Sequence, residues 1–340
     1  MKLLKKATSV CLFIVVMAAL LAGCNKTGSD GEATGGNTEG NLPSDAIQQV
    51  VDPDDGRPVI TIITSNDPMK QIGALNASYA VDMAGYRPEI LTHDGTVEGE
   101  AGLFDSAIEN KSVAIICDVQ SSVYSGEAIK KAKLNNIPTF TVNSLLLEEG
   151  VAINQFVTNN YEITREAAVE YVNKAGQIGK FSIIMGPDGS NASEVRMAAF
   201  TEVLVQYQGL EMVTYEAVDS TDYESEIKKF LKDNDNINGI LCVTEEITLA
   251  ALKVKADLGL NDLVIVGFGG NNEIKEAITS GQLAAAVLPP ISIVGEMAGE
   301  RAAGFLADSS EGFEEIQPIE ATLITAENVE YLENYIYSEY

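Results

Sequence analysis

Histidine, tryptophan and cysteine are scarce in this chain, and their scarcity removes several classes of site. The sequence holds one histidine, no tryptophan and four cysteines. A lone histidine, His93, cannot share a metal with a second one, and neither C-x-x-C nor H-E-x-x-H occurs. No G-x-S-x-G elbow accompanies it, as a serine hydrolase would need. We therefore expect no metal site and no enzyme, and we interpret His93 as a polar loop residue.

Basic residues are also few. Lys and Arg number 22 against 50 Asp and Glu, which gives a formal net charge of −28. A chain this acidic repels nucleic acid, so no nucleic-acid partner is expected. The glycine-rich segment 267–270 follows a strand-like run, but Asn272 stands where a dinucleotide loop has its third glycine. No nucleotide and no other cofactor is expected.

The first residues are typical of a secretory signal. Lys2, Lys5 and Lys6 precede an apolar run at 10–21 that is too short to span a bilayer comfortably. The following Leu21-Ala22-Gly23-Cys24 resembles the bacterial lipobox, which implies a signal peptide at 1–23 and lipid attachment at Cys24. An ordinary cleaved signal with a chance cysteine is the alternative.

The segment that follows has almost nothing apolar to bury. Residues 25–44 are rich in Gly, Asn, Thr, Ser and acidic residues, which predicts a flexible tether, taken to extend over 24–56. We expect an extracytoplasmic protein that a lipid anchors to the cell membrane without a spanning helix. Farther on, Cys117 and Cys242 lie in separate apolar runs, where buried free thiols are expected and a disulfide is not.

From Pro58 onward, short β-branched runs alternate with longer stretches of helical period. This alternation predicts an α/β fold with parallel sheets and helices on both faces. In such folds the loops that follow the strands share one edge of the sheet, where ligands bind. The strand-like runs are 59–64, 88–91, 113–117, 139–142, 181–184, 212–215, 239–243, 263–267 and 284–288. The helical stretches are 72–84, 101–109, 126–134, 163–175, 192–207, 224–233, 246–258, 272–279 and 293–307.

The order and spacing of several segments resemble the ribose-binding group of periplasmic binding proteins, whose ligand core is shared with the lac repressor family. The resemblance covers about 57–325, and its most specific parts are 109–118, 128–143, 157–161, 219–226, 237–246, 263–270 and 278–285. It implies two Rossmann-like lobes with parallel sheets, joined by a three-segment hinge. The crossings should fall near 158–161, 287–290 and 318–322. The first lobe would comprise 57–158 plus 290–318, and the second 159–289 plus 319–340.

The ligand positions that the resemblance implies depart from the family in both lobes. Met69 and Lys70 follow Asp67 and Pro68 where relatives have aromatics, and Asn143 is followed by Ser144 where many relatives have Asp-Arg. In the second lobe the clamping arginine corresponds to Glu194, with Arg196 as a candidate replacement, and Tyr223 matches an aromatic position. The expected Asn, Asp and Gln are replaced by Thr244, Gly269 and Pro289.

Sugar sites combine charged and amide groups with aromatic faces, and many of the family's groups are missing here. Ribose itself is therefore not expected. We predict a cleft lined by polar residues that follow strands, together with one methionine, although such residues could also simply solvate the strand ends. They are Asn66, Asp67, Met69, Asp118, Gln120, Asn143, Ser144, Asn160, Asp188, Asn191, Tyr223, Thr244, Glu245 and Asn271.

The resemblance implies a solute-binding protein of an ABC importer. Such a protein traps a small polar ligand, here a carbohydrate or a related metabolite, by hinge motion and docks on the permease subunits. We expect it to act as a monomer. The alternative is a sensory protein that presents its ligand to a membrane histidine kinase, which the sequence does not separate from transport. A cytosolic repressor is not expected, because a signal and an acidic tether occupy the place of a DNA-binding headpiece.

Overall fold

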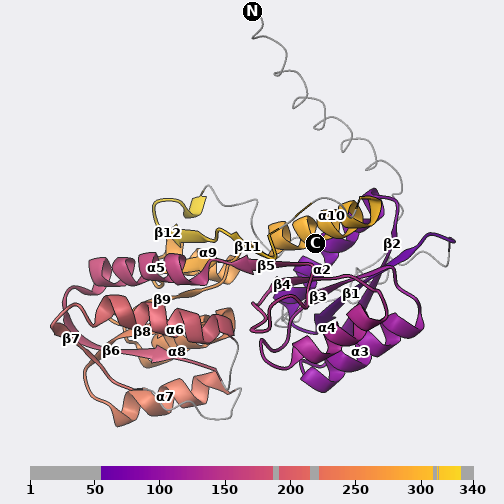
Figure 1. Ribbon diagram of the computed structural model, residues 1–340. Helices are drawn as coiled ribbons and strands as arrows, with labels where there is room; N and C mark the ends of the chain where they lie inside the picture. Colours follow the sequence, from indigo (N-terminus) through magenta and orange to yellow (C-terminus); the bar gives the residue numbers. More distant parts are fainter. Residues whose placement is uncertain (1–54, 187–190, 215–221, 309–311, 313, 331–340) are drawn as a thin grey trace, which may run out of the picture. The chain divides into compact units, whose positions relative to one another are not determined.

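The computed structural model describes residues 55–186, 191–214, 222–308, 312 and 314–330. These residues form two α/β lobes, each built around a six-stranded sheet (Figure 1). The expected fold class is confirmed. Cys24, the signal peptide and all but the last two residues of the tether lie outside the described residues. No helix in the described part of the chain has both the length and the apolarity needed to cross a membrane.

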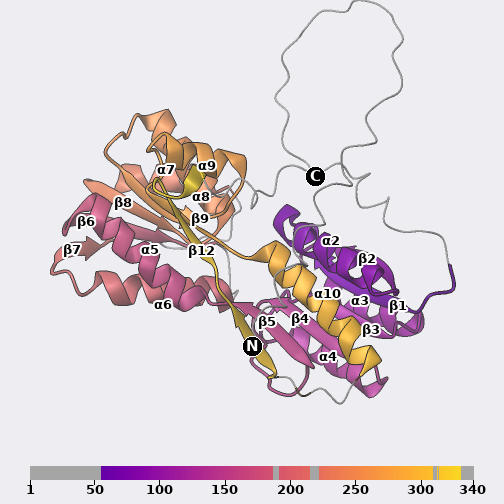
Figure 2. The same ribbon diagram turned by 90° about the horizontal axis from the view of Figure 1, so that it is seen from above.

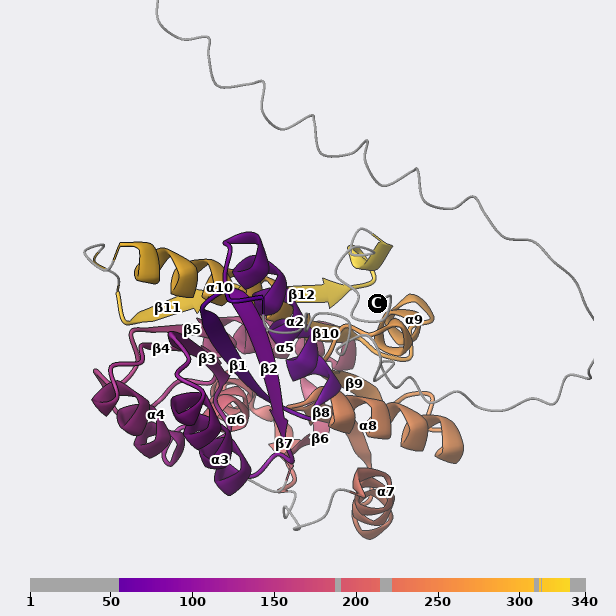
Figure 3. The same ribbon diagram turned by 90° about the vertical axis from the view of Figure 1, so that its right-hand side faces the viewer.

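The sheet of the first lobe is entirely parallel. Its strands, in spatial order, are β11 (Ile316–Ile319), β5 (Asn154–Thr158), β4 (Thr139–Asn143), β3 (Ala114–Asp118), β1 (Val59–Ser65) and β2 (Arg87–His93). On one face α2 (Pro68–Met83) and α10 (Ile291–Ala307) lie side by side, and on the other lie α3 (Val97–Glu109) and α4 (Ser125–Leu134) (Figures 1 and 3). Each face has its own apolar core.

The second lobe repeats this plan with one difference. Its strands, in spatial order, are β12 (Thr322–Thr325), β10 (Ala285–Leu288), β9 (Val264–Phe268), β8 (Ile237–Cys242), β6 (Ile178–Ile184) and β7 (Gly209–Met212). The two helices α5 (Asn160–Ala175) and α6 (Asn191–Leu204) pack together on one face (Figure 2). The opposite face carries α7 (Tyr223–Asp233), α8 (Glu245–Leu258) and α9 (Asn272–Thr279).

One strand corrects the expectation of purely parallel sheets. β12 pairs antiparallel with β10. The chain enters β12 directly from β11 after two residues, without a crossover helix, so the rule that keeps βαβ strands parallel does not apply to it. The antiparallel strand lies at the edge of the sheet, where a single antiparallel strand is common in otherwise parallel sheets.

The chain passes between the two sheets three times. It leaves the first sheet after β5 for α5, returns after β10 to α10, and leaves again between β11 and β12. Consequently α10 belongs to the first lobe although most of the second lobe precedes it in the sequence. Its residues Val294, Ala298 and Ala302 are buried in the core that α2 shares.

Local sequence explains where several helices and the inner strand β3 lie. β3 is buried at all five positions, as its continuous apolar run Ala-Ile-Ile-Cys indicates. Asp67, Thr96 and Thr244 each accept a backbone N–H at the start of a helix, and Gly259 ends α8 in the left-handed conformation. Since each cap directly follows a strand or a short loop, polar residues gather at the carboxyl edge of both sheets.

Candidate functional site

Both lobes have the strand order that places a crevice between the first and third strands. Leaving out the added β11 and β12, the order is β2-β1-β3-β4-β5 in the first lobe and β7-β6-β8-β9-β10 in the second. In such sheets the connections leave β1 and β3, or β6 and β8, toward opposite faces. Ligands bind at this switch point, beyond the carboxyl ends of the strands. The candidate site is therefore built from the segments after these four strands and their neighbours.

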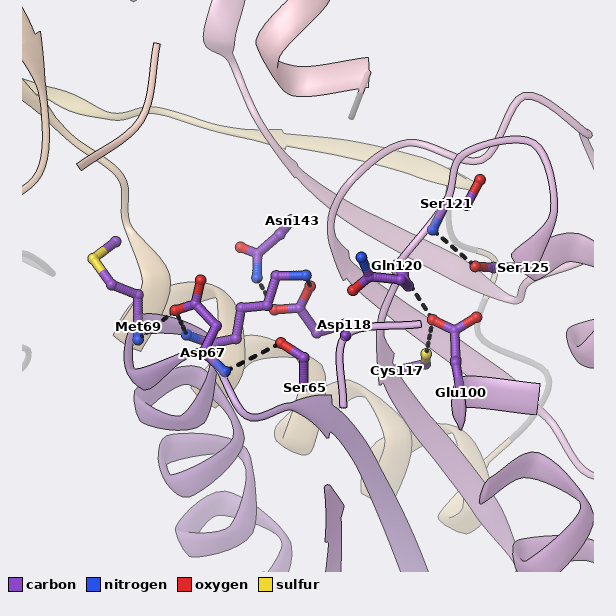
Figure 4. A network of polar contacts seen from close by, with 12 residues as sticks. Ser65, Asp67, Met69, Glu100, Cys117, Asp118, Gln120, Ser121, Ser125 and Asn143 are labelled. Carbon is purple, nitrogen blue, oxygen red and sulfur yellow. Dashed lines mark hydrogen bonds and ion pairs between the residues drawn. The ribbon is translucent and has the colours of Figure 1, made fainter. Parts of the chain in front are cut away.

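In the first lobe, a charged network occupies this point (Figure 4). Asp118 ends β3, and its side chain is only 4% exposed. Lys70, from the first turn of α2, places Nζ 3.3 Å from Asp118 Oδ1. Asn143, which ends β4, donates from Nδ2 to Asp118 Oδ2 at 2.5 Å. The carboxylate of Asp118 thus links the end of β3 to α2 and to the end of β4.

The two charges in this network stabilise each other. Burial raises the pKa of Asp118, and Lys70 and Asn143 only partly offset the rise. Burial lowers the pKa of Lys70, but the carboxylates of Asp118 and Asp67 outweigh it and the net shift is upward. Asn143 Oδ1 is buried and has no hydrogen-bond partner, so this acceptor remains for a ligand. Asn143 also has φ +67, a left-handed conformation that asparagine tolerates better than most residues.

The other predicted site residues of the first lobe differ in exposure and in how the fold uses them. Asp67 caps α2, accepting the N–H groups of Met69 at 2.8 Å and Lys70 at 3.3 Å through Oδ1. Met69 and Ser144 are half-buried. Asn66 is exposed, and its N–H donates to the carbonyl of His93. The fold therefore uses Asp67 through Oδ1, and within the described residues Oδ2 makes no hydrogen bond that would prevent a contact with a ligand.

Gln120 lies in the loop that joins β3 to α4, and a buried carboxyl holds that loop. Its backbone N–H donates to Glu100 Oε2 at 2.7 Å. The side chain of Gln120 is half-buried, so it can contribute an amide to the site. Glu100 itself is 0% exposed, and burial raises its pKa.

The interpretation of His93 as a polar loop residue is wrong. His93 ends β2 and is 6% exposed. Its Nδ1 accepts the N–H of Gly95 at 3.1 Å, so the proton of the neutral ring is on Nε2, which is buried without a partner. Burial and then the charge of Lys70 lower the pKa of His93. The imidazole ring of His93 is therefore buried near Lys70 of the charged network.

In the second lobe, Arg196 of α6 contacts neutral groups. Its Nε donates to Asn160 Oδ1 at 2.8 Å, and its Nη1 donates to the carbonyl of Val243 at 2.7 Å. The guanidinium carbon lies 3.9 Å from the centre of the Phe268 ring. Among the described residues no carboxylate pairs with it, and burial lowers its pKa to about 9. Arg196 therefore remains a cation, and some of its five N–H donors make no hydrogen bond to the described residues.

Glu245, the first residue of α8, spans to the loop after β9. Its Oε2 accepts the N–H of Gly270 at 2.8 Å, and its Oε1 accepts Asn271 Nδ2 at 3.1 Å. Burial raises the pKa of this carboxyl. Gly269 has φ +125, and a Cβ there would lie 2.4 Å from Glu245 Oε2. The absence of a side chain at 269 thus makes room for the carboxylate of Glu245.

The remaining second-lobe predictions fall into three groups. Thr244 and Asn271 cap α8 and α9, accepting the N–H groups of Ile247 and Ile274. Tyr223 is half-buried, and its hydroxyl would lie 2.9 Å from a Cβ at Gly186. Asp188 lies outside the described residues, and so does the side chain of Asn191, the first residue of α6.

Two charged residues at the switch points were absent from the predicted cleft. Lys70 and Arg196 both reach the strand ends from helices, whereas the prediction drew on the segments directly after strands. Arg196 was noted only as a replacement for an arginine at 194, and Glu194 is exposed. Within the described ranges no three histidine, cysteine or acidic side chains converge as metal ligands would. Both described cysteines are buried free thiols, as predicted.

Comparisons with known proteins agree with this architecture. Residues 59–307 match the family model described as a periplasmic binding protein domain. A D-apiose import binding protein of Actinobacillus succinogenes is 27% identical over 286 residues, which cover 83% of this chain and 92% of that protein. The ribose import binding protein of Escherichia coli is 22% identical, with 67% of this chain and 77% of that protein covered.

Solved structures show the same fold. A solute-binding protein of Actinobacillus succinogenes with bound D-allose gives a TM-score of 0.75 at 17% identity, covering 81% of this chain and 100% of that one. One from Agrobacterium radiobacter in complex with D-arabinose also gives 0.75, at 20% identity, covering 83% of this chain and 99% of that one. The expected resemblance is confirmed.

Proposed function

Because this chain belongs to the periplasmic binding protein family, we propose that it captures a small sugar at the two switch points and delivers it to an ABC importer. The relatives named above are import binding proteins, which favours import over the sensory alternative. The proposal places the protein outside the cytoplasm, held at the membrane by lipid on Cys24. Its partners would be the sugar, the permease and the membrane, and it would act as a monomer.

The observation that carries this proposal is the complementary set of unused polar groups at the strand ends. The first lobe offers a buried acceptor on Asn143, and the second offers a guanidinium that no described carboxylate neutralises. A sugar hydroxyl both donates and accepts, so neighbouring hydroxyls on one ring suit such a mixed set. Hydrogen bonds to charged groups are the stronger ones, which suits recognition of a solute that is itself well hydrated.

Calorimetric titration of the protein without its first 56 residues would test the proposal. We expect D-apiose, D-arabinose or D-allose to bind, and D-ribose to bind more weakly than at least one of them. Asp67→Ala and Asn143→Ala should each weaken that binding, and unchanged affinity in both would mean that the first-lobe site is misplaced. Absence of binding to every sugar and polyol tested would refute the function.

A second experiment addresses catalysis. Family members are binding proteins, so we propose that the bound sugar is released unchanged. Nuclear magnetic resonance spectra of each sugar after prolonged incubation with protein should match those of the sugar alone. The appearance of any product would mean that the site carries out a reaction.

The lipid anchor has its own test. Expression of the full chain in a bacterium should yield a membrane-associated protein whose N-terminal peptide begins at Cys24 and carries acyl mass. Cys24→Ala should release the protein from the membrane fraction. Processing at a different residue, or release of the unaltered protein, would contradict this proposal while leaving sugar binding intact.

A further inference from the structure

Glu100 is an unusual residue for its place in the fold. It lies on α3 and is 0% exposed, whereas Glu98 and Glu109 of the same helix are exposed. Acidic side chains are almost never fully buried unless they are paired, because burial removes their hydration. No ion pair involves Glu100 among the described residues, and its Oε1 has no hydrogen-bond partner. Its burial therefore costs stability, and the cost calls for an explanation.

The contacts of Glu100 converge on the loop between β3 and α4 (Figure 4). Oε2 accepts the backbone N–H of Gln120 at 2.7 Å and lies 3.6 Å from the thiol sulfur of Cys117. Ser125 Oγ, at the start of α4, accepts the N–H of Ser121 in the same loop at 3.0 Å. One buried carboxyl thus holds the loop directly after β3.

The rest of this loop is fixed by one serine hydroxyl and one backbone carbonyl. Ser121 Oγ accepts the N–H of Tyr124 at 3.2 Å, and the carbonyl of Ser122 accepts the N–H of Leu147 at 3.0 Å. These bonds close the loop upon itself and onto the segment after β4. At Gln120 the loop instead depends on a side chain from another helix, and that position is two residues from Asp118. Loss of the Glu100 contact would free the part of the loop nearest the charged network.

We propose that Glu100 is a positioning residue for ligand binding: it holds the Gln120 backbone, and so fixes Asp118 and the Gln120 side chain in the geometry that receives the ligand. This inference rests on the proposed sugar-binding function. Glu100 does not touch the ligand in this proposal and acts only through the loop.

Substitutions of Glu100 separate positioning from general stability. Glu100→Gln keeps an oxygen that can accept the Gln120 N–H. It should bind whichever of D-apiose, D-arabinose and D-allose the unaltered protein binds, with an affinity within about threefold of that protein. Glu100→Ala removes the acceptor and should weaken binding about tenfold, measured well below its melting temperature. Glu109→Ala, an exposed carboxylate on the same helix, serves as the control and should leave affinity unchanged. Equal affinities for Glu100→Ala and the control would overturn the inference.

Amide hydrogen exchange gives a readout that needs no ligand. In the unaltered protein the Gln120 amide should be protected. In Glu100→Gln the loop at 118–124 should remain protected, and in Glu100→Ala it should exchange at least about tenfold faster while β1 and β4 stay unchanged. If Glu100→Ala does not fold, the protection of Gln120 in the unaltered protein and in Glu100→Gln decides, because a freely exchanging amide there would contradict the contact. If the unaltered protein binds no sugar, the proposed function fails, yet exchange still shows whether Glu100 holds the loop.

Discussion

The two lobes share a strand order but differ in how they compensate charge at their switch points. In the first lobe, Asp118 is paired with Lys70 and bonded to Asn143. In the second, Arg196 bonds to an amide oxygen and a carbonyl, and Glu245 bonds to a backbone N–H and an amide. The first lobe therefore presents an assembled network, whereas the second presents two separate charged side chains with no oppositely charged partner among the described residues. The same fold thus supports a compensated charge pair in one lobe and uncompensated charged side chains in the other.

The largest expected effect concerns the assembled network. Lys70→Met leaves the buried Asp118 carboxylate without its cation and should lower the free energy of unfolding by about 3 kcal/mol in urea titrations at neutral pH. The loss should shrink as the pH falls toward the raised pKa of Asp118, because the protonated carboxyl no longer needs the cation. Lys130→Met, which removes surface pairs with Glu127 and Glu148, should cost about 0.5 kcal/mol. Similar losses in both variants would mean that the buried pair contributes no more to stability than the surface pairs do.

The second prediction addresses the unneutralised arginine. Arg196→Ala should weaken sugar binding about 30-fold, since a hydrogen bond to a charged group is lost. Arg196→Lys keeps the charge but loses the planar fork that spans Asn160 and Val243, so it should not restore affinity fully. Calorimetry would measure both. Arg165→Ala on α5, where Arg165 pairs with Glu162 at the surface, is the matched control and should bind normally.

The third prediction tests whether Glu245 needs the open space at Gly269. Gly269→Ala should destabilise the protein by about 2 kcal/mol, through both the backbone conformation and the displaced carboxylate. Gly281→Ala has a positive φ and nothing within 4 Å of the added Cβ, so it should cost about 1 kcal/mol. Adding Glu245→Ala to each variant completes a thermal-unfolding cycle. Glu245→Ala should reduce the destabilisation by Gly269→Ala but not that by Gly281→Ala. If it reduced neither, or both equally, the carboxylate of Glu245 would not occupy the space at Gly269.

The smallest expected effect is a pH dependence from His93. Its pKa in the folded state lies below the ordinary value of 6.5, so the unfolded chain binds the proton more readily. The contribution of His93 to stability is therefore present above that ordinary value and is lost as the pH falls toward the lowered one. His93→Asn should flatten this part of the curve of unfolding free energy against pH. An identical slope in both proteins would place the titration elsewhere.

The alternation of strands and helices was readable from the sequence, but the short or polar strands were not. β5 carries Asn154 and Gln155, which look unsuited to a core strand. Both are buried because their side-chain amides bond to 314–315, far away in the sequence. β11 contains Pro318, a residue that favours an edge. The strand predicted at 212–215 lies earlier, at Gly209–Met212, where it is mostly exposed and weakly patterned.

The sequence predicted polar residues at the strand ends, but it did not show which of them the fold itself uses. Asp67, Thr244 and Asn271 follow strands as ligand residues do, yet the same residue types are the favoured helix caps, and all three cap helices. A local pattern does not distinguish the two uses. Lys70 and Glu100 were missed for the opposite reason. Each acts from within a helix on the end of β3, and only the folded structure brings them there.

The three passages of the chain between its sheets constrain how the protein can be made. The first lobe is closed by α10, whose Val294, Ala298 and Ala302 are buried there, and β11 adds its last strand. Both elements are synthesised after almost the whole second lobe, so neither lobe corresponds to an uninterrupted length of polypeptide. A chain truncated after β10 would leave α2 with an uncovered apolar side. During synthesis the first lobe must therefore stay incomplete until α10 and β11 have been added.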